Sequence, residues 1–541
     1  MRLSDYLDKG ASLGADAPCF TTNGESLSYA EVQQLSVDIA AALRASGVAP
    51  GDAVAILSSN DPVAFATVFG ISRVGAVWSP INPRSEASED RELLDRFDCT
   101  VLVYQSSFTA LVATILRGLP KITTVVCLDG PAEFGVSFAD WIAAGPPENA
   151  TAGHASAARA SAERASAERA SAAHASAESV RGDLVDDLAM IVGTGGTTGK
   201  PKGVMLTTRN LETMTSIVLM SYPFHGRPVY LALPPLTHAA GVLCFPILAR
   251  GGEIVIMPKP DIHEWLDLME RHRVTHAFLP PTLIYMLLGD PQLEQHDFSS
   301  LQCFWYGAAP MSTARLEEAI TRIGPVMAQL FGQTEAPMMI STMAPDEHFR
   351  ADGTLDRARL TSAGHAAPLV TVAVMDESGA ILEAGERGEI VIRSALVMAG
   401  YYKNPDATAE ASKYGWHHTG DIGYVDADGY VFIVDRAKDM IITGGFNVYS
   451  AEVEQSVMRF PGVRDCAVVG LPDDKWGEQV TAVIQTDAST PVDVEQLRLF
   501  VRSELGSIKT PKQIEIWADL PRSKVGKVLK GDIKATLLKL R

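Results

Sequence analysis

The residues best suited to chemistry lie in a loop rich in glycine and threonine. Four glycines and three threonines fill positions 193–199, and Lys200 and Lys202 follow. Such a loop can turn several backbone N–H groups and hydroxyls toward one point, which suits a phosphate group. It is not a Walker P-loop, because Thr194 stands where that pattern needs glycine and Pro201 follows Lys200. Taken alone, the loop predicts either a phosphate site or an ordinary turn.

Three further segments place polar, glycine or proline residues directly after apolar runs. They are Pro-Pro-Leu-Thr-His at 234–238, Gly-Ala-Ala-Pro at 307–310 and Phe-Gly-Gln-Thr-Glu at 331–335. The runs before them, like residues 188–192 before the glycine-rich loop, predict buried strands. Each segment alone is typical of a turn, but the ends of strands are where open α/β sheets bind ligands.

The elements that must position these segments alternate between strands and helices. Ser28 and Glu31 form a capping-box pattern before a helix, and Gly47 and Pro50 end it. A second helix is predicted at 62–74, and strands are predicted at 53–57, 76–78, 100–104 and 123–128. The alternation predicts an α/β fold with doubly wound layers.

Length and composition limit the classes of protein. A chain of 541 residues exceeds a single core, and 47% hydrophobic residues exclude a wholly disordered chain. A net charge of −19 argues against general nucleic-acid binding. The six cysteines form no CxxC pair, which favours a reducing compartment without a disulfide framework. No signal-peptide pattern or apolar run of membrane-spanning length is present, so we expect a cytoplasmic protein.

One segment interrupts the α/β pattern. Residues 150–180 repeat alanine, serine and charged residues on a five-residue period, with almost no large apolar side chain. That period cannot hold one face of a helix, and the segment has nothing with which to form a core. It is predicted to be a solvated surface insert; the alternative is an arm that docks a partner.

The segment 194–203 resembles the signature loop of the adenylate-forming superfamily, which contains acyl-CoA synthetases, luciferases and adenylation domains. Gly195 departs from the family, which usually has serine there. Segments 234–238, 307–310 and 331–335 resemble the family's acyl-gate, adenine and substrate-phosphate motifs, in the family's order. The later matches are Trp-His-His-Thr-Gly-Asp at 416–421, Asp-Arg-Ala-Lys-Asp at 435–439, Thr-Gly-Gly-Phe-Asn at 443–447 and Pro-Arg-Ser-Lys-Val-Gly-Lys at 521–527.

The resemblance covers almost the whole chain apart from the insert, and it implies two domains. Residues 1–435 would form the N-terminal domain that binds ATP and the acid, with a β-barrel-like part beside the doubly wound layers. Residues 436–541 would form a small, mobile α+β domain that swivels about a hinge at 436–439, where Lys438 matches the hinge position.

The resemblance also implies a site for ATP and Mg²⁺. The β- and γ-phosphates would contact Thr194, Gly195, Gly196, Thr197, Thr198, Gly199 and Lys202. Thr334 would meet the α-phosphate, and Glu335 would bind Mg²⁺, a hard cation that prefers oxygen ligands. The adenine would lie against Gly307, Ala308, Ala309, Phe331, Gly332 and Gln333. Phe331 stands where the family usually has tyrosine, which keeps ring stacking and loses a phenolic hydrogen bond.

Four more positions receive roles from the same resemblance. Asp421 would accept hydrogen bonds from the ribose hydroxyls, to which Arg436 would donate; outside the family context Asp421 would be a turn carboxylate. Lys527 would reach the carboxylate and the α-phosphate. His238 would lie between the adenylate and the acyl pocket, its alternative being a buried structural histidine.

The resemblance further implies that Gly444 and Gly445 line the tunnel for the pantetheine arm of coenzyme A. These motifs favour an ATP-dependent carboxylate–CoA ligase, an acid–thiol ligase that makes an acyl-adenylate and then a thioester, releasing AMP and pyrophosphate. Fatty-acid and lipid metabolism is the expected setting.

Several alternatives stay open beside the ligase. Amino-acid adenylation is disfavoured, because residues 237–252 contain no Asp or Glu to pair with an α-ammonium group. Transfer of the acyl group to a separate carrier protein is compatible with the sequence. A non-catalytic adenylate-binding scaffold is disfavoured by Glu335 and Lys527, which binding of AMP alone does not need. Luciferase-like oxidation is disfavoured, because it needs a special acyl group and the C-terminus carries no peroxisomal signal.

The acid and the assembly are less constrained. The apolar runs at 242–248 and 338–340 suggest a pocket for a fatty, aryl or polycyclic acid. The expected partners are a small carboxylic acid and CoA, with no nucleic acid and no transmembrane segment. Peripheral membrane contact and a dimer are both compatible with the sequence.

Overall fold

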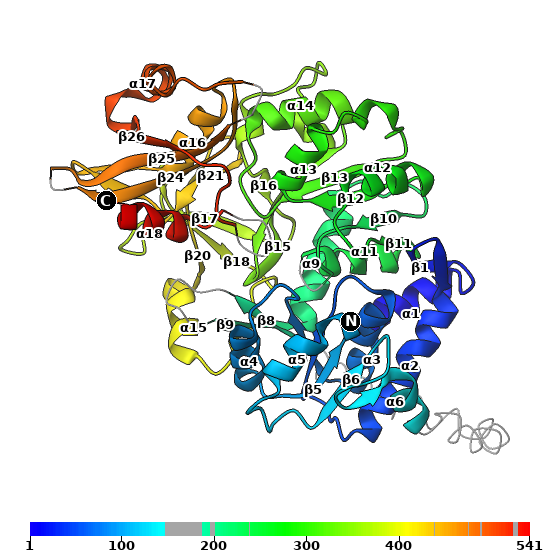
Figure 1. Cartoon of the computed structure of the whole chain (residues 1–541). Helices are drawn as coiled ribbons and strands as arrows, with labels where there is room; N and C mark the ends of the chain where they lie inside the picture. Colours follow the sequence, from blue (N-terminus) through cyan, green and yellow to red (C-terminus); the bar gives the residue numbers. More distant parts are fainter. Residues whose placement is uncertain are drawn as a thin grey trace, which may run out of the picture.

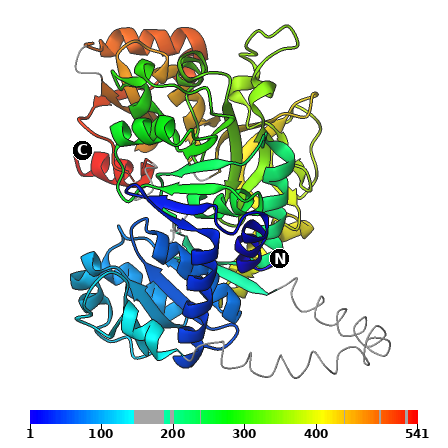
Figure 2. The ribbon, with the colours of Figure 1, turned by 90° about the vertical axis from the view of Figure 1, so that its right-hand side faces the viewer.

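The computed structural model describes residues 1–145, 187–194, 201–236, 239–437, 439–473, 475–486, 490–522 and 528–540. The insert predicted at 150–180 therefore lies outside the described residues. Figure 1 shows the N-terminal sheet at one end of the molecule and the C-terminal segment at the other, and Figure 2 shows the same order from the side.

Within the described residues, eight strands form the first sheet, in the order β19-β9-β8-β4-β3-β5-β6-β7. They are β3 (Ala53–Leu57), β4 (Val77–Ile81), β5 (Cys99–Tyr104), β6 (Thr124–Cys127), β7 (Val136–Ser137), β8 (Leu188–Thr194), β9 (Lys202–Thr207) and β19 (Gly400–Tyr401). The strands β8, β4, β3, β5, β6 and β7 run parallel, whereas β9 and β19 are antiparallel to their neighbours.

Nine strands of the described chain form the second sheet, in the order β16-β15-β14-β13-β12-β10-β11-β1-β2. They are β1 (Pro18–Thr22), β2 (Glu25–Ser28), β10 (Val229–Ala232), β11 (Glu253–Ile256), β12 (His276–Leu279), β13 (Cys303–Gly307), β14 (Met327–Gln333), β15 (Ala336–Met343) and β16 (His365–Ala366). The central strands β11, β10, β12, β13 and β14 run parallel, so their carboxyl ends share one edge.

Helices connect and cover the two sheets, as doubly wound layers require. They are α1 (Leu3–Leu13), α2 (Tyr29–Ala45), α3 (Pro62–Val74), α4 (Ala87–Arg96), α5 (Thr109–Ile115), α6 (Phe138–Ala144), α9 (Thr208–Ser221), α10 (Ala239–Val242), α11 (Cys244–Ala249), α12 (Ile262–Arg271), α13 (Pro281–Leu288) and α14 (Thr313–Ile323). One hydrophobic core joins the two sheets, because Trp78 of the first sheet and Trp305 of the second belong to the same buried cluster. The relative position of the carboxyl edges of the two sheets is therefore fixed by packing.

Local sequence signals explain where the early helices begin and end. The Ser28 side chain caps α2 and the Glu31 carboxylate accepts from the Ser28 N–H, so the predicted capping box is confirmed. Asp61 caps α3 through the N–H groups of Val63 and Ala64. This helix has the predicted bounds.

A third sheet occupies the part that was expected to be barrel-like. Its strands are β17 (Thr371–Met375), β18 (Gly388–Arg393), β20 (His417–Val425) and β21 (Val431–Arg436), and α15 (Pro405–Ala411) precedes β20. In the described residues these strands pair antiparallel in the order β17-β18-β20-β21, and the first and last strands do not pair. The part is therefore an open sheet, not a closed barrel.

The C-terminal segment has its own sheet and its own core. The sheet contains β22 (Ile441–Thr443), β23 (Phe446–Val448), β24 (Val463–Asp473), β25 (Gly477–Thr486) and β26 (Gln513–Ile516). The helices are α16 (Ser450–Met458), α17 (Val494–Lys509) and α18 (Lys530–Leu540). β21 ends and β22 begins on either side of the predicted hinge, while the division into a fixed and a swivelling domain stays a prediction.

In the part of the chain that is described, no helix is long and apolar enough to cross a membrane.

Candidate functional site

The base of the predicted phosphate loop is a hairpin of the first sheet. Thr194 ends β8 and lies opposite Lys202, the first residue of β9. The Thr194 hydroxyl donates to the Lys202 carbonyl at 3.4 Å. Residues 195–200, and with them Gly195, Gly196, Thr197, Thr198 and Gly199, lie outside the described residues. The structure therefore places the two ends of the loop at the carboxyl end of a parallel strand.

The predicted adenine segments lie side by side in the second sheet. Gly307, the last residue of β13, pairs with Leu330 of β14. A Cβ atom on Gly307 would lie 2.3 Å from the Leu330 carbonyl oxygen, so only glycine fits. Ala308 has a φ of 66°, a conformation that costs energy for a residue with a Cβ and that is frequent at functional sites. The end of β13 therefore combines a close approach to β14 with a strained backbone at the predicted adenine segment.

Gln333 connects this edge with the start of β20. Its side-chain amide lies 3.1 Å from Nε2 of His417, which belongs to the predicted ribose motif at 416–421. Burial lowers the pKa of His417, which keeps its ring neutral and able to accept from the amide. The second and third sheets are joined by this contact.

The two residues that are predicted to contact the ribose, Asp421 and Arg436, form an ion pair with each other. Asp421 of β20 and Arg436 of β21 are direct partners in the antiparallel register, and their side chains form an ion pair of 2.7 Å from Nε to Oδ1. The Asp421 side chain is 4% exposed and that of Arg436 is 39% exposed. A carboxylate held in this way keeps its charge in a buried position and can accept hydroxyl donors.

Glu335 lies in the tight turn between β14 and β15, and a residue that the sequence analysis missed holds it. The Tyr401 hydroxyl donates to Oε1 of Glu335 at 2.8 Å. The Lys202 ammonium nitrogen lies 4.8 Å from the centroid of the same tyrosine ring. Tyr401 thus connects the base of the phosphate loop with the predicted metal ligand. Its strand β19 has two residues, which is too short for any periodic signal in the sequence.

The donor set at Glu335 fits Mg²⁺ better than a metal held by protein alone. Among the described residues, no three His, Cys, Asp or Glu side chains form a group that could hold a metal ion. Mg²⁺ is usually bound by one or two carboxylates together with phosphate oxygens and water. Glu335, a single carboxylate that Tyr401 connects to Lys202 at the base of the predicted phosphate loop, satisfies that requirement.

Asn60 is a second residue that the sequence analysis missed. Its amide nitrogen donates to the carbonyls of Leu233, Pro234 and Met257 at 3.1, 3.2 and 3.1 Å. Its amide oxygen accepts from the Leu236 N–H at 2.8 Å. Asn60 follows β3, so it ties the first sheet to the segment that leads to His238, which itself lies outside the described residues. The polar run Ser-Ser-Asn-Asp at 58–61, directly after a strand, is the signal that could have identified it.

The C-terminal segment presents the other predicted residues. Gly444 and Gly445 form the turn between β22 and β23, with φ values of 58° and 80°. Beside them, Phe446 is 57% exposed and Trp476 is 42% exposed.

Arg522, which precedes the part of the chain that contains Lys527, contacts a helix beside the second sheet. Lys527 and Lys438 lie outside the described residues. Arg522 forms an isolated antiparallel bridge with Val528, and its guanidinium donates to the Thr282 hydroxyl at 3.4 Å. Thr282 lies in α13, which begins just after the carboxyl end of β12.

The apolar runs that suggested an acid pocket are mainly core. Leu243, Phe245 and Leu248 are fully buried in the cluster between the first two sheets, together with Met339 and Ile340. Their contact with an acid stays a prediction.

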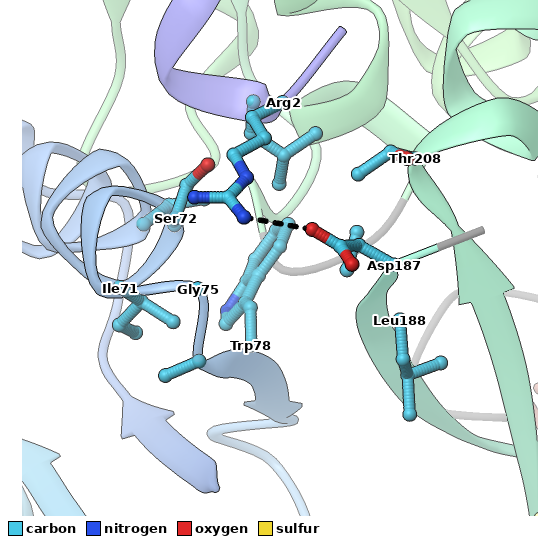
Figure 3. A pocket seen from close by; sticks show the side chains of 12 residues that line it. Arg2, Ile71, Ser72, Gly75, Trp78, Asp187, Leu188 and Thr208 are labelled. Carbon is cyan, nitrogen blue, oxygen red and sulfur yellow. Dashed lines mark hydrogen bonds and ion pairs between the residues drawn. The ribbon is translucent and has the colours of Figure 1, made fainter. Parts of the chain in front are cut away.

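A small cavity of about 10 Å³ lies elsewhere, around Arg2 and Asp187, which form an ion pair of 2.8 Å (Figure 3). Asp187 precedes β8 and Gly75 precedes β4, so the cavity is at the amino ends of the strands. Ligands of open α/β sheets bind at the opposite, carboxyl edge. The cavity is a packing feature and not the candidate site.

Comparison with known proteins agrees with this geometry. The family model of AMP-binding enzymes matches residues 7–402, and the model of their C-terminal domain matches residues 452–527. A feruloyl-CoA synthase of Amycolatopsis is 33% identical over 538 residues, which are 98% of this chain and 98% of that protein. The medium/long-chain-fatty-acid–CoA ligase FadD8 of Mycobacterium tuberculosis is 41% identical over 357 residues, 65% of this chain and 61% of that protein.

A solved structure gives the same result for the fold. The amide bond synthetase McbA from Marinactinospora thermotolerans has a TM-score of 0.84 and 29% identity, and the match covers 99% of each chain. The chain belongs to the AMP-binding enzymes, and the predicted membership of the adenylate-forming superfamily is confirmed.

Proposed function

We propose that the chain is an ATP-dependent carboxylate–CoA ligase that forms an acyl-adenylate and then an acyl-CoA thioester. The observation that carries the proposal is the convergence of three predicted parts at adjoining carboxyl edges. The Tyr401 ring lies between Lys202 of the β8–β9 hairpin and Glu335. The predicted adenine segment at 307–309 begins at the end of β13, which pairs with β14, and β14 leads to Glu335. Gln333 in turn contacts the strand that carries Asp421.

The chemistry requires two transfers. In the first, a carboxylate oxygen of the acid attacks the α-phosphorus of ATP, and the bond to the bridging oxygen breaks to release pyrophosphate. In the second, the thiol of CoA attacks the acyl carbon and AMP leaves while the thiol loses its proton. Both steps depend on holding the reactants in line and on neutralising developing negative charge.

The residues at the site suit these tasks. Thr194, the loop at 195–199 and Lys202 hold the β- and γ-phosphates, and Thr334 holds the α-phosphate. Mg²⁺, when bound at Glu335, supplies charge neutralisation on the phosphate oxygens. Lys527 approaches the α-phosphate and the acid from the C-terminal segment, a role that the contact of Arg522 with α13 supports.

The nucleoside is held by the neighbouring segments. Asp421 accepts from the ribose hydroxyls and Arg436 both donates and keeps Asp421 charged. Gly307, Ala308 and Ala309 allow close approach of the adenine, against which Phe331, Gly332 and Gln333 lie.

The C-terminal segment serves the second transfer. Residues 436–541 swivel about Lys438, and the turn at Gly444 and Gly445 then lines the path of the pantetheine arm. Phe446 and Trp476 beside this turn are exposed, which supports the proposal that the turn can contact another surface after the segment swivels. The domain boundary at 435/436 belongs to this proposal.

The proposed substrate is a hydrophobic carboxylic acid. The support is the acid-free, apolar segment at 237–252 and the activities for which two relatives are named, a fatty-acid–CoA ligase and a feruloyl-CoA synthase. A carrier protein is the second candidate acceptor, since the fatty acid–[acyl-carrier-protein] ligase ScoC of Streptomyces coeruleorubidus is 32% identical over 523 residues. The cysteines support a cytoplasmic setting, because all six lie in the described ranges as buried free thiols.

The experiment is a panel of fatty, aryl and polycyclic acids assayed for pyrophosphate release with ATP and Mg²⁺, with CoA or a carrier protein as acceptor. We expect acid-dependent release and a thioester with CoA. An apolar acid should have a much larger kcat/KM than its α-amino analogue, because a buried ammonium would lack a partner. Equal kcat/KM values for the pair would contradict the apolar pocket, and a thioester only on the carrier would assign the other acceptor.

A further inference from the structure

Tyr401 lies where two sheets meet, and its backbone is held on both sides. β19 pairs with β9 so that Gly400 faces Met205 and Tyr401 faces Val204. The Tyr401 N–H donates to the Thr408 hydroxyl at 2.9 Å. The ring is therefore fixed against the strand that begins with Lys202.

Glu335 receives two contacts from the same short segment. The Met398 N–H donates to the Glu335 carbonyl at 2.8 Å, and the Tyr401 hydroxyl donates to Oε1 at 2.8 Å. No residue in the described ranges donates to Oε2. The carboxylate is thus anchored through one oxygen, and its second oxygen is left for another ligand.

We infer that Tyr401 is a positioning residue for the metal and the triphosphate: its hydroxyl orients the Glu335 carboxylate toward the cation, and its ring positions Lys202. This inference rests on the proposed function, which places Mg²⁺ at Glu335 and phosphates at Lys202. The physical reason is that hydrogen-bond partners of ligating carboxylates fix their orientation and tune metal affinity.

The test is Tyr401→Phe, which keeps the ring beside Lys202 and removes only the hydroxyl. Mn²⁺ binding is measured by electron paramagnetic resonance in the presence of an ATP analogue with a methylene group between the α- and β-phosphorus atoms. The dissociation constant for Mn²⁺ should rise by roughly 10-fold, the lower end of the usual effect of such partners. Binding of the analogue without metal, in EDTA, should be unchanged.

The matched control is the neighbouring Tyr402→Phe. Its hydroxyl donates at 2.8 Å to a different carboxylate, Asp98, so the same chemical change should leave Mn²⁺ binding as in the wild type. In a Glu335→Gln background, Tyr401→Phe should have no further effect, because the carboxylate through which it acts is gone.

The outcomes separate the inference from the function on which it rests. A wild type with neither acid-dependent pyrophosphate release nor Mn²⁺ binding beside the analogue would overturn the proposed function. A functional wild type whose Tyr401→Phe variant binds Mn²⁺ equally tightly overturns this inference alone, as does an equal loss in the Glu335→Gln background. If Tyr401→Phe does not fold, Tyr401→Leu replaces it, since leucine also has no hydrogen-bond donor, and wild-type Mn²⁺ affinity in that variant again overturns the inference.

Discussion

The predicted metal site around Glu335 and the predicted coenzyme A tunnel around Gly444 are built in opposite ways. Around Glu335, the side chains are tied to the edges of two sheets by Tyr401, Met398 and the β9–β19 pairing. Around Gly444, the turn projects from the C-terminal sheet, with Phe446 and Trp476 exposed beside it. The difference fits our proposal that the C-terminal segment turns between the two transfers while the sheets around Glu335 keep their positions.

The C-terminal segment contacts the preceding part of the molecule through polar side chains. Across the interface, Gln455 donates to the Met311 carbonyl at 3.2 Å and Arg522 to the Thr282 hydroxyl at 3.4 Å. Both acceptors are neutral and inexpensive to separate, whereas the buried carboxylate of Asp435, at the predicted boundary, accepts from the Ser450 hydroxyl at 2.9 Å. The packing between the first and second sheets, by contrast, is a continuous buried core.

The largest expected effect concerns the C-terminal segment, which we propose to move between the two transfers. Lys527→Ala should reduce acyl-AMP formation by roughly 10²–10³-fold or more, the scale for losing one preorganised charge-stabilising donor. Thioester formation from supplied acyl-AMP and CoA should be nearly normal, because Lys527 has then turned away. Single-turnover assays of each transfer measure both rates.

Lys438→Pro is the reciprocal change, since fixing φ stiffens the hinge while leaving the adenylation position accessible. It should slow the thioester transfer and spare acyl-AMP formation. If both substitutions slow both transfers equally, the C-terminal part does not alternate between two positions.

The next prediction concerns the stability of the second sheet at acid pH. Burial lowers the pKa of His276 and of His348 to about 4. As the pH falls below the ordinary value near 6.5, the unfolded chain takes up protons first, so stability is full above 6.5 and is lost toward pH 4. Each histidine should account for about 3 kcal/mol of that loss.

Urea unfolding at pH 7.5 and pH 4.5 measures the effect, and His276→Gln should lose less stability between the two pH values than the wild type. His263, which is exposed, provides the control as His263→Gln. An unchanged pH dependence in His276→Gln would show that the ring titrates normally in the folded protein.

A smaller effect is expected at the exposed turn. Gly445→Ala places a Cβ in a left-handed conformation with open space around it, which costs about 1 kcal/mol and should slow the thioester transfer several-fold. Acyl-AMP formation should not change. Gly429→Ala, at a φ of 86° in the turn between β20 and β21, introduces the same strain and should slow neither transfer.

The smallest effect is expected for the insert. Deletion of residues 152–178 should change the free energy of unfolding by only about 1 kcal/mol, the closure entropy of a solvated loop. Ligase activity should persist. A collapse in melting temperature or kcat would show that the segment packs against the rigid part.

Much of the first sheet and of its helices was predictable from local sequence. The capping residues Ser28 and Asp61 and the strand at 53–57 act within a few positions of the chain, so their signals survive in the sequence. The ion pair of Asp421 with Arg436 was less direct. Each residue was identified through its motif, but their pairing depends on the register of β20 and β21.

The rest could not be predicted because it depends on contacts between distant segments. The expected barrel-like part is an open sheet, since strand composition does not specify closure. The sequence could not show whether the side chains at 242–248 belong to the core or to an acid pocket, because apolar side chains fill cores and line pockets alike. Which of the two they do depends on what packs against them.

The sequence by itself determined the family, the α/β class and the order of the motifs, because these are encoded in residue types and short spacings. Only the tertiary structure placed Tyr401 between Lys202 and Glu335, and Asn60 against the segment at 233–236. Tyr401 lies 66 positions from Glu335 and Asn60 lies 176 positions from Leu236. Contacts at such separations arise when sheet edges pack together, and no local pattern in the chain records them.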